Sequence, residues 1–457
     1  MFIRSVYEYY GMPTSEYLET PKGQYGRYQW RRRKGLSYYS FNIEPKSKKS
    51  MKIHEKMNFQ QKISKRMTQR SRKSYRSEII AELSITPSAN NPPHIHTAVK
   101  NLLDLFGKPM QDSGIKRKGL VYNDDKQIRY LSAEYHLGQE EPCIRSSFYP
   151  LRYFLEDLKL ANDILDGKYN DYFSYISLMQ DIKEFYGTRN LDDVHDDTVL
   201  DYKQWVKNRS KYIGLFGEKT YEKMIQLYKM QLQEYFFKTC RLYIKDVYLL
   251  YRLAGLISNS RFERLGLEQF EEWARNQSDS LSKWITHSPL KIKLPHTPIT
   301  VGDTKRFKVA IQKKLNDYKK KYEILQPLYN PIALEVIYKP PLASDGFYKD
   351  LDNIMRLILP IFNNEFKPPP SFLSLCNTDD IPDEDMIAGI KRRSQLLPKS
   401  IKHSVIKYEI FEIPRHRNDT EEGFISIGIT GGLSCLDTLW CRMDKIIEKW
   451  KEHCDTC

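Results

Sequence analysis

An internal repeat is the feature that most constrains the fold of this 457-residue chain. The same series of expected elements (strand, basic helix, strand, proline-bounded turn, helix, loop, strand) occurs in residues 36–145 and again in residues 290–432. Residues 146–289, between the copies, show helical periodicity instead. Self-similarity of this kind indicates one structural unit per copy. The sequence therefore predicts an α+β protein in which two similar units, each a small sheet with helices, are joined by an all-helical insertion.

Apolar periodicity predicts the individual elements, because strands alternate with period two and helices repeat every three or four residues. In the first copy we expect strands at 38–43, 78–85 and 127–136, a partly helical basic segment at 46–76, and a helix at 94–106. In the second copy we expect strands at 290–294, 332–338, 405–413 and 424–429, a helix at 305–322, and a helix that begins at about 350 and closes at 360–364. Residues 1–35 are expected to form a poorly ordered or docked basic arm, and residues 433–457 a terminal helix and tail.

The net charge of +15 favours a polyanionic partner, most simply branched or duplex DNA. The positive charge is concentrated in the basic segment 46–76 and in the helix 305–322. Contacts from such residues to phosphates fix position without reading sequence. The candidate DNA-binding residues are Lys48, Lys49, Lys52, Lys65, Arg66, Arg70, Lys305, Arg306 and Lys313.

Other classes of protein are disfavoured by the composition. A mean hydropathy of −0.62 and the lack of a long apolar run argue against a membrane protein. The first ten residues do not resemble a secretory leader. Seven scattered cysteines do not form a disulfide framework, and the pair Cys454 and Cys457 lacks a partner pair with zinc-site spacing. We therefore expect free thiols and a cytoplasmic protein.

The start of the helix in the second copy has the clearest chemistry. Asp350 and Asp352 lie one residue apart, and Asn353 follows them directly. Carboxylate oxygens are the ligands that hard divalent cations prefer. Arg356 lies one helical turn after Asp352, where a positive charge can stabilise a phosphate. This stretch alone is a weak signal for a metal-dependent phosphodiesterase.

The aligned helix start of the first copy replaces both acids by histidine. It reads His94-Ile95-His96, and Lys100 stands in the position of Arg356. Before its third strand the first copy carries Asp124-Asp125, whereas the second copy has Lys402-His403. The two copies therefore differ in a complementary way, with acids at the helix start of one and an acid pair before the third strand of the other.

In these motifs both copies resemble the RusA-type Holliday-junction resolvases, over about residues 36–140 and 290–430. The family signature is similar to D-x-D-N-x-x-K at a helix start, followed by an Asp-Asp pair before the next strand. The resemblance implies a Mg-dependent (or Mn-dependent) structure-selective endonuclease that acts on branched DNA in recombination or repair. It also implies that the chain mimics the family homodimer as a pseudo-dimer, and so is a monomer. The catalytic residues that it implies are Asp350, Asp352, Arg356, Asp124, Asp125 and Lys100.

Three arrangements of the metal site remain open. A composite site would join the Asp350–Asp352 pair to the Asp124–Asp125 pair across the pseudo-dimer. A site in the second copy would borrow an acid from its loop, either Asp379, Asp380 or Asp383, unless that loop is an ordinary solvated insertion. A site in the first copy would combine His94 and His96 with its own acid pair, and such mixed donors favour Mn or Zn over Mg. In this last case the alternative is that the two histidines are a decayed motif.

A non-catalytic interpretation accompanies the nuclease hypothesis. Because both copies are degenerate, the protein could be a catalytically inactive DNA-binding protein that uses its basic segments to hold phosphates. The helical middle would either set the separation of the two units or bind a protein partner.

Overall fold

The computed structural model describes residues 14–89, 91–137, 141–153, 197–234, 291–293, 301–341, 349–367, 404–412, 420 and 423–432. Within these ranges it contains a mixed α+β fold built around one eight-stranded sheet. A search of the same ranges finds no helix that is long and apolar enough to cross a membrane.

The sheet has the strand order β1-β4-β2-β3-β7-β6-β8-β5, which reads as the same four-strand arrangement twice, from the two edges inward. In each half the outer pairings are antiparallel, and the pairings β2–β3 and β6–β7 are parallel. The strands of the first half are β1 (Ser37–Phe41), β2 (Ile79–Thr86), β3 (Ile128–Tyr135) and β4 (Cys143–Pro150). Those of the second half are β5 (Lys291–Lys293), β6 (Ile332–Lys339), β7 (Val405–Glu412) and β8 (Phe424–Gly431).

The two halves join where β3 pairs antiparallel with β7. Ser132 of β3 lies opposite Glu409 of β7. Ser132 is also the partner of Glu82 in β2, as Glu409 is the partner of Glu335 in β6, so the two residues occupy equivalent places. The halves are therefore related by an approximate two-fold axis through this pair. A register shift recurs at the first residue of β2 and at the first residue of β6, as expected for copies of one unit.

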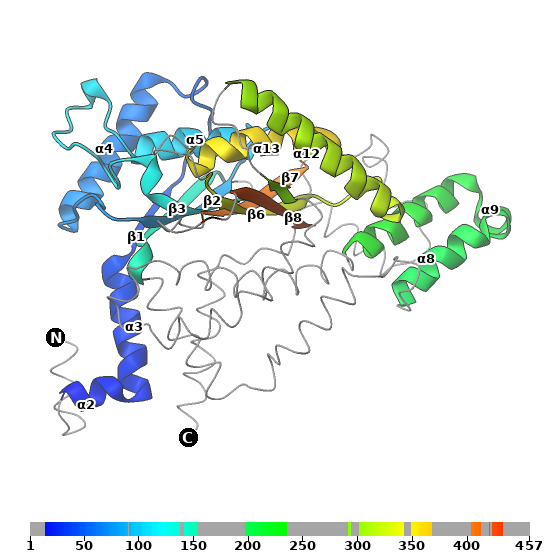
Figure 1. The fold of residues 1–457 in the computed structure, drawn as a ribbon, viewed down its shortest axis with the longest axis horizontal. Helices are drawn as coiled ribbons and strands as arrows, with labels where there is room; N and C mark the ends of the chain where they lie inside the picture. The colour runs from blue at the N-terminus through cyan, green and yellow to red at the C-terminus, as the bar shows by residue number, and fades with distance from the viewer. Residues whose placement is uncertain are drawn as a thin grey trace.

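Four helices lie on one face of the sheet (Figure 1). α5 (Ile95–Phe106) connects β2 to β3, and α13 (Leu351–Glu365) connects β6 to β7. These two helices pack against each other and against both central strands. α4 (Ile53–Gln69) lies beside α5, and α12 (Val301–Lys321) lies beside α13. The buried apolar faces of all four helices belong to one core cluster with the strands, so the two halves share a continuous core.

Buried apolar spacing explains why these helices form. In α5 and α13 buried residues recur every three or four positions, which aligns them along the side that meets the sheet. The long apolar side chains Phe106 and Phe362 are fully buried there. Pro360 lies inside α13 rather than at its end, although an interior proline removes a backbone hydrogen bond and usually breaks a helix.

The described residues contain the strands and helices expected from the repeat. One further strand of the first half, β4, was not predicted, and it crosses the expected boundary at residue 145 by five residues. Of the two alternatives for the arm, poorly ordered or docked, the structure has the docked one for residues 14–35, which form α2 (Thr14–Glu19) and α3 (Pro21–Gly35). Arg72 and Tyr75 donate hydrogen bonds to carbonyl groups at the end of α3 and so attach it to the first half.

Parts of the insertion are described. α8 (Asp197–Lys207), α9 (Arg209–Phe216) and the helical residues 218–234 confirm the helical prediction for these residues. The predicted terminal helix, the acidic loop 379–385, the pair Lys402-His403 and the cysteines near the C-terminus lie outside the described residues.

Candidate metal centre

The topology of the central strands determines which residues can meet. β6 runs parallel to β7, and α13 is the next described helix after β6. It begins on the side of the sheet where β7 ends, and we call each side formed by the strand ends an edge. Because β3 runs antiparallel to β7, its beginning lies at that same edge. The turn before β3 therefore faces the start of α13, although the two belong to different copies. An acid from each copy is brought to one place by the antiparallel pairing at the two-fold axis.

The start of α13 presents two acids. Asp350 is the residue that precedes the helix, and its carbonyl accepts the amide of Ile354 at 3.1 Å. Asn353 donates its side-chain amide to the Asp350 carboxylate at 3.4 Å. Asp352 lies in the first turn and its side chain is only 3% exposed. A carboxylate in the first turn of a helix is stabilised by the positive end of the helix dipole.

The third acid comes from a short 3-10 turn, η2 (Asp125–Gln127), that leads into β3. Asp124 caps this turn by accepting the amide of Lys126 at 3.0 Å. Gln127 accepts the amides of Asn123 and Asp124, and donates to the carbonyls of Tyr75 and Ser77. These bonds fix the backbone on both sides of Asp125. Asp124 therefore caps the turn, whereas the side chain of Asp125 points into the site.

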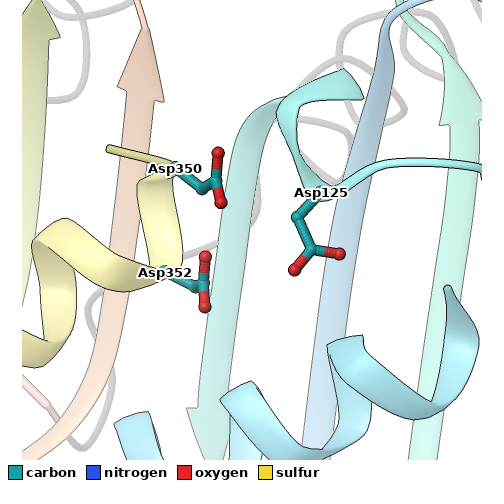
Figure 2. Close-up of side chains that lie close together, drawn as sticks. All are labelled: Asp125, Asp350 and Asp352. Atoms are coloured by element: carbon teal, nitrogen blue, oxygen red, sulfur yellow. The ribbon is translucent and has the colours of Figure 1, made fainter. Parts of the chain in front are cut away.

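Asp125, Asp350 and Asp352 form one cluster, in which each offers a carboxylate oxygen and all three oxygens lie within 4.8 Å of one another. Figure 2 shows the pair from α13 and Asp125 from the opposite side directed toward a common space. It is the only group of three metal-ligating side chains found in the described ranges. Within the described residues, the structure therefore brings together the acids of the composite arrangement, apart from Asp124.

Lys100 of α5 enters the same cluster. Its ammonium nitrogen lies 2.9 Å from Asp352, 3.0 Å from Asp125 and 3.2 Å from Asp104. The side chain is 20% exposed. Burial alone would lower the pKa of Lys100, but Asp352 and Asp125 outweigh it and hold that pKa above its ordinary value. Lys100 is therefore a permanent positive charge shared between the two copies.

Burial and mutual repulsion still disfavour the charged forms of Asp125 and Asp350, although Lys100 lies beside the cluster. Burial raises the pKa of Asp125, and the neighbouring Asp352 and Asp104 raise it further against the opposing effect of Lys100. Burial and the charges of Asp352 and Asp125 likewise raise the pKa of Asp350. Three carboxylates and one ammonium leave two net negative charges in a largely enclosed space. A divalent cation would neutralise this excess.

The donor set fits magnesium or manganese. All three ligands are carboxylate oxygens, which hard cations prefer to imidazole or thiolate. Two ligands of one Mg²⁺, each at about 2.1 Å, lie at most roughly 4.2 Å apart, so small side-chain rotations would close the observed spacing. Asp350 and Asp125 also line a pocket of about 470 Å³, which gives a ligand access to the cluster.

The other predicted site residues lie elsewhere. Arg356 is exposed and donates to the side-chain oxygen of Asn353 at 3.3 Å, and its predicted role in stabilising phosphate charge stays a prediction. Lys100, the residue of the first copy that aligns with Arg356, is the one whose ammonium reaches the aspartates.

The mixed-ligand site of the first copy does not form. His94 and His96 stack at 5.6 Å at the start of α5, whereas a side chain at Gly107, just after its end, would lie 3.6 Å from Asp125. A helix of this length, with a rise of about 1.5 Å per residue, separates its ends by about 18 Å. The histidines and the acid pair of one copy therefore lie at opposite edges of the sheet. The acids of the loop 379–385 lie outside the described residues, so that alternative stays a prediction.

Sequence reasoning did not find the ion pair below the centre. Arg129, near the start of β3, pairs with Glu412 at the end of β7 and lies 3.3 Å from Glu78. Burial raises the pKa of Glu412, and Arg129 opposes that effect. This pair links the two copies at the same edge as the metal centre. No signal in a single copy could have revealed it, because each residue belongs to a different repeat.

Basic residues surround the approach to the centre. The pocket beside the acids is also lined by Lys48, Lys56 and Lys108. A second pocket, of about 770 Å³, adjoins it, since both include Lys108 and Asn123. Six cations and no acid line the second pocket, namely Arg72, Lys73, Arg76, Lys108, Arg117 and Lys118. Of the predicted DNA-binding residues, only Lys48 lines either pocket, and the contacts predicted for the others stay predictions.

Comparison of the chain with models of known families, with curated proteins and with solved structures finds no match.

Proposed function

We propose that the protein is a metal-dependent, structure-selective DNA endonuclease built from two diverged units similar to RusA-type resolvases. The observation that carries this proposal is the meeting of Asp125 with Asp350 and Asp352 within 4.8 Å, with Lys100 ion-paired between them. The order of elements and the complementary motifs of the two copies agree with such an origin. The net charge and the cationic pockets beside the acids suit a phosphodiester substrate.

Each residue of the centre has a role in this proposal. Asp125, Asp350 and Asp352 would hold Mg²⁺ or Mn²⁺, which when bound supplies an activated water and neutralises charge on the phosphate. Lys100 is placed to balance the carboxylates and to stabilise negative charge that develops on the substrate. Asp124 and Gln127 act as positioning residues, because their hydrogen bonds fix the turn that carries Asp125.

A binding protein without nuclease activity is the second candidate, and one observation favours it. The ammonium of Lys100 lies within 3.0 Å of both Asp125 and Asp352, so a protein cation already compensates part of their charge. In that case the centre would be a salt-bridge cluster that holds the two halves together. Branched DNA would then be bound through the basic surface alone.

An assay with labelled DNA separates the two candidates. The protein is incubated with a four-way junction or with linear duplex of the same sequence, in Mg²⁺ or Mn²⁺, and compared with Asp352→Asn. The nuclease proposal expects metal-dependent nicking of the junction that falls by about 10³-fold in the variant, equivalent to about 4 kcal/mol of lost transition-state stabilisation. Binding without nicking by both proteins supports the second candidate. Equal nicking by both proteins would contradict the proposed role of the centre.

A further inference from the structure

The linker between the basic helix and the following strand differs sharply between the two halves. In the first half it runs from the end of α4 to β2 and contributes Arg72, Lys73 and Arg76 to the cationic pocket. In the second half the corresponding residues 322–331, between α12 and β6, contain no lysine or arginine. This linker is therefore strongly basic in one copy and has no basic residue of its own in the other.

The linker of the second half is also covered by protein. Gln233, in the helical residues 218–234, donates hydrogen bonds of 2.8 Å to the carbonyls of Leu325 and Pro327. Its side-chain oxygen accepts the amide of Tyr329 at 3.0 Å. Asn330 donates to the carbonyl of Met230 at 3.0 Å. Gln233 is fully buried by this packing, so the insertion covers the linker whose counterpart lines the open pocket in the first half.

The basic pocket of the first half is open and leads to the acids. Lys73, Arg76, Lys108 and Lys118 are all exposed. Arg72 and Arg117, in contrast, also hold backbone carbonyls, so they shape the wall of the pocket as well as charging it. Lys108 and Asn123 belong to both pockets, and the pocket beyond them is lined by Asp125 and Asp350. The two pockets form one groove, which we call the first-half groove.

We propose that a nucleic acid is bound on one side of the molecule only, with its phosphates along the first-half groove from Arg76 past Lys108 to the acid cluster, while the helical insertion blocks the equivalent path over the second half. This inference rests on the proposed function only in treating the acid cluster at the end of the groove as a nuclease centre. The binding path itself is inferred from the cations of the groove and from the packing of the insertion on the second half. The part of the groove between Arg76 and Lys118 is lined by cations without acids, which is the arrangement that phosphate backbones select. The insertion thus removes the symmetry of binding that the repeat would otherwise give.

Two triple variants with equal change of charge test the binding path. Lys73→Glu/Arg76→Glu/Lys118→Glu reverses exposed cations of the groove, and Lys308→Glu/Lys314→Glu/Lys320→Glu reverses exposed cations of α12 in the second half. Binding of a fluorescent four-way junction is measured by anisotropy in EDTA, over a range of salt. We expect the groove variant to bind at least 10-fold more weakly, with a salt slope smaller by about 2–3, because each lost phosphate contact removes roughly one unit. The α12 variant should change the dissociation constant less than 2-fold.

Several outcomes would overturn the inference. Equal weakening by both variants would mean that binding is not one-sided, and unchanged binding of the groove variant would mean that the groove is not the path. Competition by polyglutamate as strong as that by duplex of the same charge would remove the assignment to nucleic acid. The single variant Lys108→Glu, at the exposed residue shared by both pockets, provides a milder test, with an expected weakening of about 3-fold or more. Since the assay contains no free metal, loss of nicking would leave this inference intact, and loss of groove binding would leave the metal centre intact.

Discussion

The starts of α13 and α5 are equivalent in the repeat and lie at opposite ends of the central strands, but they carry different metal-ligating residues. At one edge, Asp350 and Asp352 of the second copy meet Asp125 of the first. At the other edge, the equivalent helix start carries His94 and His96, and they belong to no group of three metal-ligating residues in the described part of the chain. A homodimer would build both centres alike, because symmetry forces the same residues onto both. Fusion into one chain allows one centre to keep its acids while the other loses them.

The largest expected effect compares these two edges directly. Asp125→Asn should reduce nicking of a junction by about 10³-fold, because it removes one of three ligands and leaves the amide unable to neutralise a cation. The double variant His94→Asn/His96→Asn should keep nicking within about 3-fold, since these residues lie at the far end of α5. Initial rates at saturating DNA provide the measurement. If the double variant were as inactive as Asp125→Asn, the claim that only the edge with the three aspartates supports nicking would be wrong.

A smaller effect is expected from the lysine that joins the copies. Lys100→Met keeps the length of the side chain but leaves Asp125, Asp352 and Asp104 without their shared cation. Loss of one partner of a largely buried ion pair costs about 3–5 kcal/mol, so the unfolding midpoint should fall in the absence of metal. Saturating Mg²⁺ should recover more stability in this variant than in the parent, because the ion neutralises the freed carboxylates. Thermal unfolding with and without Mg²⁺ provides the test, and an equal gain in both proteins would contradict the described electrostatics.

The smallest expected effect concerns the pairing of the halves away from the centre. Glu134 of β3 lies 3.0 Å from Lys407 of β7 and 2.5 Å from His136. Burial would raise its pKa, but the hydrogen bond from His136 and the charge of Lys407 lower it from 4.5 to about 2. A lowered folded-state pKa gives stability that is present above about pH 4.5 and is lost as the pH falls toward about 2.

Glu134→Gln should therefore lower the urea midpoint at pH 7, and the difference from the parent should shrink between about pH 4.5 and pH 2. The exposed Glu323→Gln serves as the matched control, with no change expected at either pH. A difference for Glu134→Gln that is the same at both ends of this range would show that the pair does not stabilise the interface through charge.

Much of this fold follows from apolar periodicity in the sequence, but the composition of the site does not. The repeat located β2, α5 and β3 and their counterparts, because their buried faces have clear helix and strand periods. β4 was missed, because the consecutive polar residues Arg145, Ser146 and Ser147 interrupt the apolar alternation and a helical stretch follows. The N-terminal helix α3 was missed because its glycines and basic run lack an apolar stripe.

The composite centre was one of three arrangements left open by the sequence. What brings the acids of the composite centre together is the antiparallel pairing of β3 with β7, which no local pattern reveals. The mixed site is excluded within the first copy itself. Because β2 and β3 are parallel and α5 connects them, His94 and Asp125 lie at opposite ends of that helix. The basic groove was hidden for a similar reason, since it combines residues 72–76 with residues 108–118, which are distant in sequence.

The most direct test of the account is the binding of Mn²⁺ to the protein and to variants in each copy, measured by titration calorimetry without DNA. Because the centre takes ligands from both halves, Asp125→Asn and Asp352→Asn should each weaken Mn²⁺ binding at this centre by 10-fold or more. The Asp125→Asn/Asp352→Asn double variant should bind Mn²⁺ no more weakly than the sum of the two single effects. His94→Asn/His96→Asn should bind as the parent does. Loss of binding in Asp352→Asn with full binding in Asp125→Asn would show that the second copy holds its metal alone, and would contradict a centre shared between the repeats.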